Sequence, residues 1–272
     1  MKQVLKVKIH QPDAHYRIPF SYQRRFTYPI PPYSTVKGLI CNLMGIRDDA
    51  DERLKKIKEG LSLAIYGRYE SLIKEYIWFR NLKMKSHIDK FHTVTNRIID
   101  NIPQHPGQQM PVTVDVLHNV SLIIYIYHPD VDFLRNIKDA FENPSERLST
   151  IHLGRSEDWI VLEEIRWPVE LRRESVTNIK YSTWMPEKKF ADKGFIDGEY
   201  EDFFIRLSGN LFRLPTFYKI TESNQRIFNE YITVKLYEGG SFKRNKFYVD
   251  DNENLPLIFS RLKGDEDARN SG

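Results

Sequence analysis

The chain has 272 residues, of which 40% are hydrophobic and 29% charged, and its formal net charge is +4. This length and apolar content allow a sizeable core, in one large domain or two small ones. No run approaches the roughly eighteen apolar residues of a membrane helix, and the alternating N-terminus MKQVLKVKIH does not resemble a signal peptide. A globular protein that stays in the cytoplasm and has no membrane role is therefore expected.

Charge is unevenly distributed along the chain. Residues 1–100 hold 19 Lys and Arg against 10 Asp and Glu, whereas the remainder holds 22 against 27. A basic N-terminal part is consistent with a polyanionic partner, although solvated surface charge explains any single cluster equally well. Cys41 is the only cysteine, which excludes an internal disulfide and a cysteine-based zinc cluster. We expect no metal or other cofactor.

The hydrophobic periodicity predicts strands and helices in a definite order. In the first strand, apolar residues at 5, 7 and 9 alternate with basic residues at 6, 8 and 10, which predicts one buried and one basic face. A charged link follows the first helix, and Asp130 or Asp132 is expected to cap the second helix. The predicted elements are a strand near 5–10, a helix at 34–45, strands at 61–69 and 120–127, a helix ending before Asn143, and a strand at 159–167.

This order, strand–helix–strand twice, predicts an α+β fold with a ferredoxin-like (RRM-like) split βαβ core over residues 1–167. An insertion at about 70–118 interrupts the core, and its first part, 69–80, fits a helix or a strand. Residues 168–263 are expected to form a β-rich extension packed on the core, with strand-like runs at 203–207 and 231–237. The polar end, 264–272, is expected to be disordered.

A stiff, basic and aromatic segment, Arg17 to Gly45, leads into the first helix. Pro29, Pro31 and Pro32 fix φ and remove backbone donors, so the approach is extended. Ser34 or Thr35 is expected to cap the helix, leaving its N-terminal amides available to an anion. The basic and aromatic side chains near this anion site are Arg24, Arg25, Tyr28, Tyr33 and Lys37. The tyrosines either stack on bases or pack beneath the loop.

A second motif, HLGRSEDW, spans residues 152–159 and enters the last predicted strand. Gly154 can take a positive φ, and the Arg155 guanidinium can bind a phosphate with two hydrogen bonds. Equally, Arg155 can form a salt bridge to Glu157 or Asp158 that only shapes the turn. The motif alone leaves both interpretations open.

The sequence contains no established catalytic or metal-binding motif: no HExxH, no nucleophile elbow and no Walker loop. Metal-independent RNA cleavage needs a base, an acid and a cation at one phosphate. Residue types suited to these roles occur at His15, Tyr16, Tyr33, Lys85, His87 and His92. Their distribution along the chain does not show that they meet, so a protein without catalytic activity is the preferred hypothesis.

The segment YQRRFTYPIPPYSTVKGLI (22–40) and the HLGRSEDW motif, on a split βαβ pattern, resemble the Cas-five family of CRISPR-associated proteins in the RAMP superfamily. The resemblance covers roughly residues 1–167 and is closest to the subtype I-B or I-A branch. It implies a non-catalytic, RNA-binding subunit that caps the five-prime handle of the crRNA in a type I Cascade. The implied partners are the backbone and large subunits and, through the complex, target DNA in antiviral defence.

The resemblance also implies which residues bind RNA. Arg24 and Arg25 would contact handle phosphates, and the insertion would form a β-hairpin thumb that presses on a kinked nucleotide. In the subtype I-C branch the corresponding member is itself an endoribonuclease that processes precursor crRNA, which is the alternative function. The complete implied set is Arg17, Arg24, Arg25, Tyr28, Tyr33, Ser34, Thr35, Lys37, Lys83, Lys85, His87, Gly154, Arg155 and Ser156.

Overall fold

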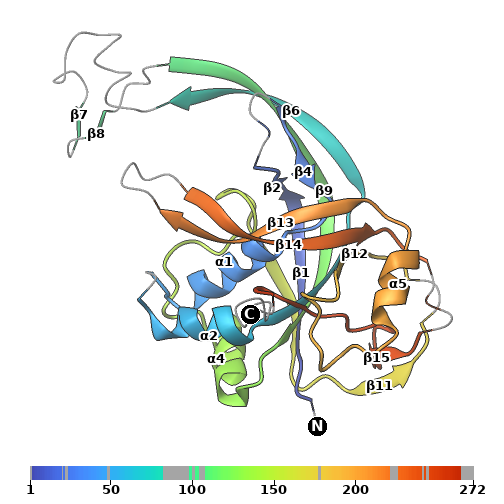
Figure 1. The fold of residues 1–272 in the computed structure, drawn as a ribbon. Coiled ribbons are helices and arrows are strands. Elements are labelled where there is room, and N and C mark those ends of the chain that lie inside the picture. The colour runs from blue at the N-terminus through green and yellow to red at the C-terminus, as the bar shows by residue number, and fades with distance from the viewer. Residues whose placement is uncertain are drawn as a thin grey trace, which may run out of the picture.

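A strand-rich architecture with few helices is seen in the computed structural model of the chain (Figure 1). The structure describes residues 2–19, 21, 24–47, 50–81, 98–99, 102–103, 108–176, 179–220, 226–240, 242 and 245–264.

Within these residues, ten strands form one sheet whose main path runs β10-β1-β9-β5-β12-β14-β13. Its first four strands come from the N-terminal two thirds of the chain and pair antiparallel throughout. Three further strands attach to this path: β16 (Ser260–Arg261) pairs with β5, and β3 (Arg24–Arg25) and β6 (Ser71–Asn81) pair with β9. The strands of the main path are β1 (Leu5–Ala14), β5 (Ser62–Arg68), β9 (Gln108–Tyr127), β10 (Val161–Arg166), β12 (Ser182–Pro186), β13 (Leu211–Ile220) and β14 (Arg226–Tyr237).

Helices cover one face of the sheet (Figure 1). They are α1 (Tyr33–Leu43), α2 (Glu52–Gly60) and α4 (Val131–Glu142). The Asp130 carboxylate accepts a hydrogen bond from the Phe133 amide, so Asp130 caps α4 as predicted. In contrast, α2 occupies the predicted charged link. The prediction missed this helix because Ile57 is its only buried side chain, which leaves almost no apolar stripe to detect.

The other face of the sheet packs against part of the C-terminal third, namely β11 (Leu171–Glu174), α5 (Tyr200–Arg206) and β15 (Phe247–Asp250). The strand predicted at 203–207 is wrong, because most of this segment forms the end of helix α5. Tyr200 and Phe203 of this helix are buried in the core. The strand predicted at 231–237 is part of β14. Because β12, β13 and β14 extend the same sheet, one continuous sheet links the N- and C-terminal parts of the chain.

The predicted basic face of β1 is also incorrect. Lys6 is fully buried, and its ammonium lies 3.1 Å from a Glu164 carboxylate oxygen, 3.5 Å from Asp250 and 3.2 Å from Glu253. Lys8 pairs with Glu164 and Glu253 as well. Acidic residues of β10 and of the C-terminal third cover this face, which the local alternation on β1 could not reveal.

A long β-hairpin arm extends from the sheet (Figure 1). It consists of β6 (Ser71–Asn81) and the first half of β9, paired antiparallel from Ser71 opposite His118 to Asn81 opposite Gln108. The segment 69–80, left open between helix and strand, is therefore largely strand. Two short strands, β7 (Ile98–Ile99) and β8 (Ile102–Pro103), form a separate pair in the same insertion.

Candidate nucleic-acid interface

The approach to α1 is extended, but the helix begins one residue earlier than predicted. Pro32 occupies the N-cap position with φ −70° and ψ 159°, and no side chain caps the helix. The Thr35 amide instead donates to the Pro32 carbonyl oxygen over 2.9 Å. Ser34 and Thr35 are thus residues of the first turn, which contains no acidic side chain. An uncapped helix start free of carboxylates favours an anion.

Tyr28 and Tyr33 pack beneath the loop. Tyr33 is fully buried, and its hydroxyl donates to the Trp184 carbonyl oxygen at 3.3 Å. Tyr28 meets the Trp184 ring edge-on with centroids 5.9 Å apart. Burial raises the pKa of Tyr28 to about 12, so its hydroxyl stays protonated. Because both rings are enclosed, they support the loop and do not offer a face to a base, which decides between the two alternatives of the sequence analysis.

Lys37 holds α1 against β13. Its ammonium donates to the Thr216 carbonyl oxygen over 2.9 Å and lies 4.2 Å from the centre of the Phe217 ring. The side chain is nearly buried at the edge of the cleft described below. Lys37 therefore positions β13, whereas the sequence analysis expected it to contact RNA directly.

The HLGRSEDW motif forms a tight turn organised by the buried Asp158 carboxylate. This carboxylate accepts from the amides of His15 (2.9 Å) and Arg155 (2.7 Å), and from the Arg155 guanidinium at 2.8 Å. Arg155 also pairs with Glu75 on β6 at 3.1 Å. Gly154 adopts φ +117°. The salt-bridge interpretation of Arg155 is thus correct, and the pairing with Glu75 additionally ties the turn to the arm.

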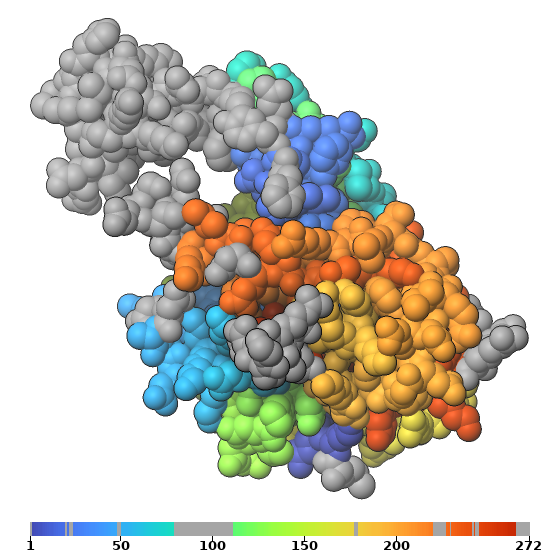
Figure 2. Space-filling view, in the orientation of Figure 1, coloured from blue at the N-terminus to red at the C-terminus, as the bar shows by residue number. Residues whose placement is uncertain are grey.

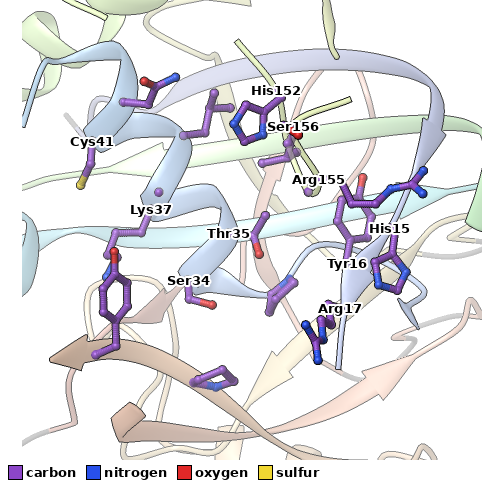
Figure 3. Close-up of a pocket in the computed structure, with 18 of the residues that line it drawn as sticks. His15, Tyr16, Arg17, Ser34, Thr35, Lys37, Cys41, His152, Arg155 and Ser156 are labelled. Carbon is purple, nitrogen blue, oxygen red and sulfur yellow. The ribbon is translucent and has the colours of Figure 1, made fainter. Parts of the chain in front are cut away.

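A cleft of about 1160 Å³ lies between this turn, the start of α1 and the β13–β14 hairpin (Figure 3). It brings together eight residues that the sequence analysis selected from two distant segments: Arg17, Arg25, Ser34, Thr35, Lys37, Gly154, Arg155 and Ser156. In Figure 2, the hairpin is the orange band that crosses the visible face between the blue N-terminal segment and the light-blue α2.

The remaining predicted residues lie elsewhere. Arg24, on β3 (Arg24–Arg25), is not among the cleft residues, and its guanidinium stacks 4.7 Å from the centre of the Phe26 ring. Arg25 is its neighbour on β3 and lines the cleft. Lys83, Lys85 and His87 lie outside the described residues.

The sequence analysis missed one wall of the cleft. Pro215, Phe217, Tyr218 and Lys219 of β13 and Phe228 of β14 line it, and Tyr218 packs against Phe228 at 5.7 Å. The run FRLPTFYKI (212–220) combines aromatic and basic residues, and this composition was the available signal. Arg47 and His152 complete the basic lining.

His15 lies at the cleft with almost no exposed surface. Its Nδ1 is 2.7 Å from the Asp115 carbonyl oxygen. Burial is the main reason that the pKa of His15 lies below its ordinary value, and the nearby Arg155 and Arg17 also lower it. Cys41 is another cleft residue, and burial raises the pKa of its thiol to about 11. At neutral pH the imidazole is therefore uncharged and the thiol is protonated.

Two further findings concern metal binding and membrane spanning. Within the described ranges, no group of three or more His, Cys, Asp or Glu is placed to hold a metal ion. None of the helices that the structure describes is long and apolar enough to cross a membrane.

Comparison with known protein families shows to which family the chain belongs. The family model for CRISPR-associated protein (Cas_Cas5) matches residues 4–187, which is most of the chain. The chain belongs to this family. The match runs past residue 167, where the resemblance drawn from the sequence ended, and includes β12 with Trp184, which contacts both tyrosines of the N-terminal loop. No curated protein matches the chain.

Solved structures of CRISPR-associated proteins align with this chain at low sequence identity. A chain of a "CRISPR RNA-guided surveillance complex" aligns with a TM-score of 0.52 and 12% identity, covering 90% of this chain and 92% of that one. A CRISPR protein from Archaeoglobus fulgidus aligns with a TM-score of 0.43 and 10% identity over 95% and 99% of the two chains. A structure described as a Cas protein gives 0.40 and 11% over 89% and 95%.

Proposed function

We propose that this member of the Cas-five family is a non-catalytic, cytoplasmic subunit of a type I Cascade that binds the five-prime handle of the crRNA. The observation that carries the proposal is the cleft, where a helix start without a carboxylate faces the HLGRSEDW turn and a basic, aromatic hairpin. Single-stranded RNA binds to surfaces that combine cations for its backbone with rings for its bases. The family membership supplies the CRISPR context.

The strand order supports the same proposal. The order β10-β1-β9-β5, with α1 and α4 on one face, is the arrangement expected of a ferredoxin-like core. On this view the β6–β9 arm is the thumb, fixed at its base by the Arg155–Glu75 ion pair. We further propose that the backbone and large subunits bind around the cleft and that target DNA is reached only through the assembled complex. Subtype I-B remains the proposed branch.

The test is RNA binding by the purified protein with both cleft arginines of the N-terminal segment removed. In Arg17→Ala/Arg25→Ala, binding to a repeat-derived single-stranded RNA should weaken, and the salt slope should fall by about 1.4, since each phosphate contributes roughly 0.7. The matched control, Arg135→Ala/Arg206→Ala, removes the same charge from α4 and α5. Equal affinity and equal salt slope in the two double variants would refute the proposed site.

The competing function is metal-independent endoribonuclease activity. One observation favours it: His15 and His152 both line the cleft, and imidazoles can serve as base and acid. Of the other residues named for this chemistry, Tyr16 also lines the cleft and Tyr33 is fully buried, whereas Lys85, His87 and His92 fall outside the described residues. Incubation of the protein with precursor RNA in EDTA separates the two functions, because the proposed subunit leaves the RNA intact and a nuclease of this kind does not.

A further inference from the structure

The proton positions of the His15 ring follow from its surroundings. A carbonyl oxygen can only accept, so the 2.7 Å contact with the Asp115 carbonyl requires a hydrogen on Nδ1. In the neutral ring Nε2 then has no hydrogen and can only accept. The low pKa of His15, set first by burial, keeps the ring in this neutral form.

Nε2 of His15 has no hydrogen-bond partner among the described residues, although the side chain is 97% buried. A buried acceptor without a donor is a free-energy cost that a folded protein usually avoids. The ring is also held in place, because its backbone amide donates to Asp158 and its Nδ1 to Asp115. Nε2 itself is covered, and because His15 lines the cleft, a ligand that displaces the covering side chains can supply the missing donor.

The neighbours of His15 indicate which donor this is. The ring lies between the Arg155 and Arg17 side chains (Figure 3), and both guanidinium groups act on it electrostatically. Guanidinium groups select phosphates. Arg155 is already held by Asp158 and Glu75, so Arg17 is the guanidinium beside the ring that contacts a phosphate, and the sugar attached to that phosphate then lies next to the imidazole. The donor on that sugar is the 2′-hydroxyl, which RNA has and DNA lacks.

We propose that Nε2 of His15 accepts a hydrogen bond from one ribose 2′-hydroxyl and that the cleft thereby distinguishes RNA from DNA. The proposal rests on the proposed function, because it assigns a role to one residue of the same RNA-binding cleft. Loss of one hydrogen bond to a buried acceptor corresponds to about a tenfold change in affinity.

Two substitutions of His15 separate the acceptor from the structural role of the ring. His15→Asn keeps an N–H near the Nδ1 position for the Asp115 carbonyl but removes the acceptor. His15→Gln places an amide oxygen near the Nε2 position and restores the acceptor. Urea unfolding of each variant shows how far the fold is retained.

Fluorescence anisotropy should be measured with a repeat-derived RNA, the DNA of the same sequence, and RNAs with a single 2′-deoxy or abasic residue at each position. For the wild type, we expect one 2′-deoxy position to weaken binding about tenfold. For His15→Asn, binding to the unmodified RNA should weaken about tenfold, and that position should lose its effect. His15→Gln should regain the sensitivity. An abasic residue removes any donor on the base. If the sensitivity that His15→Asn abolishes is to an abasic position and not to a 2′-deoxy position, the donor is a base and the assignment to the ribose is overturned.

The inference and the proposed function fail in different ways. If the wild type binds RNA with the expected salt slope but no 2′-deoxy position depends on His15, only the inference is refuted. If His15→Asn loses the same amount of affinity for every modified RNA, His15 has only a structural role and the inference is likewise refuted. If the wild type binds no RNA at all, the proposed function fails and the inference fails with it.

Discussion

Replacement of Gly154 by alanine tests whether the HLGRSEDW turn is the rigid support of the cleft. Gly154 has φ +117°, a conformation that L-residues rarely adopt, and an added Cβ would lie 2.6 Å from Asp158 Oδ2 and 3.0 Å from the His15 carbonyl oxygen. Backbone strain costs roughly 1–3 kcal/mol. Displacement of the Asp158 carboxylate also weakens its bonds to the His15 and Arg155 amides, so we expect a total loss of about 3 kcal/mol.

The assay is urea unfolding of Gly154→Ala, with Gly38→Ala as the matched control. Gly38 lines the same cleft from within α1, and an added Cβ meets no atom within 4 Å. Because alanine favours a helix over glycine by roughly 0.5–1 kcal/mol, the control should be more stable than the wild type. The two Gly→Ala substitutions are thus expected to change the free energy of unfolding in opposite directions. If Gly154→Ala unfolded at the wild-type urea concentration, the turn would not have the rigidity assigned to it.

Three other outcomes follow from the buried contacts. Lys6→Met leaves the buried Asp250 carboxylate without its cation and should cost about 3–5 kcal/mol in urea unfolding at pH 7; an unchanged midpoint would contradict the buried pairing. Burial opposes ionisation of Glu253, but hydrogen bonds from Lys8 and Lys6 outweigh it and keep its pKa below the ordinary value. This stability is present above about pH 4.5 and lost as the pH falls through the lowered pKa, which thermal scans from pH 3 to 7 should show in the wild type and less in Lys8→Met, which removes the larger of the two hydrogen-bond contributions. Tyr33→Phe removes one buried hydrogen bond and should cost about 1 kcal/mol without weakening RNA binding; weaker binding would place its ring at the ligand.

Most strands and helices of the N-terminal part could be predicted because their apolar residues either recur at helix or strand spacing or form a short continuous run. In α4, Phe133, Leu134, Ile137 and Phe141 recur at helical spacing and all are buried. The errors arise where tertiary contacts outweigh this pattern. Helix α2 was not predicted because Ile57 is its only buried side chain. The run at 203–207, predicted as a strand, belongs to helix α5, in which Tyr200 and Phe203 lie on one face and are buried in the core.

The candidate site was predictable in location but less so in the roles of its residues. Two motifs separated by more than a hundred residues were both selected, and the structure places parts of both at one cleft. Residue type alone could not separate a cation that meets a ligand from one that supports the fold. Lys37 bonds to Thr216 on β13, and Arg155 bonds to Asp158 and Glu75; these partners lie on other elements or depend on the turn geometry.

Hydrogen bonds across the fold explain why the proline-rich segment is the stiff wall of the cleft. The Trp184 indole N–H donates to the Pro31 carbonyl oxygen over 3.0 Å, which fixes the segment from the C-terminal side. On the opposite side, the buried Gln11 amide donates to the Leu153 carbonyl oxygen over 2.9 Å and binds the HLGRSEDW turn to β1. The Tyr16 hydroxyl in turn donates to the Gln11 side-chain oxygen over 2.6 Å. Ordering this wall is therefore part of folding, and the RNA that we propose to bind there would lose only its own conformational freedom.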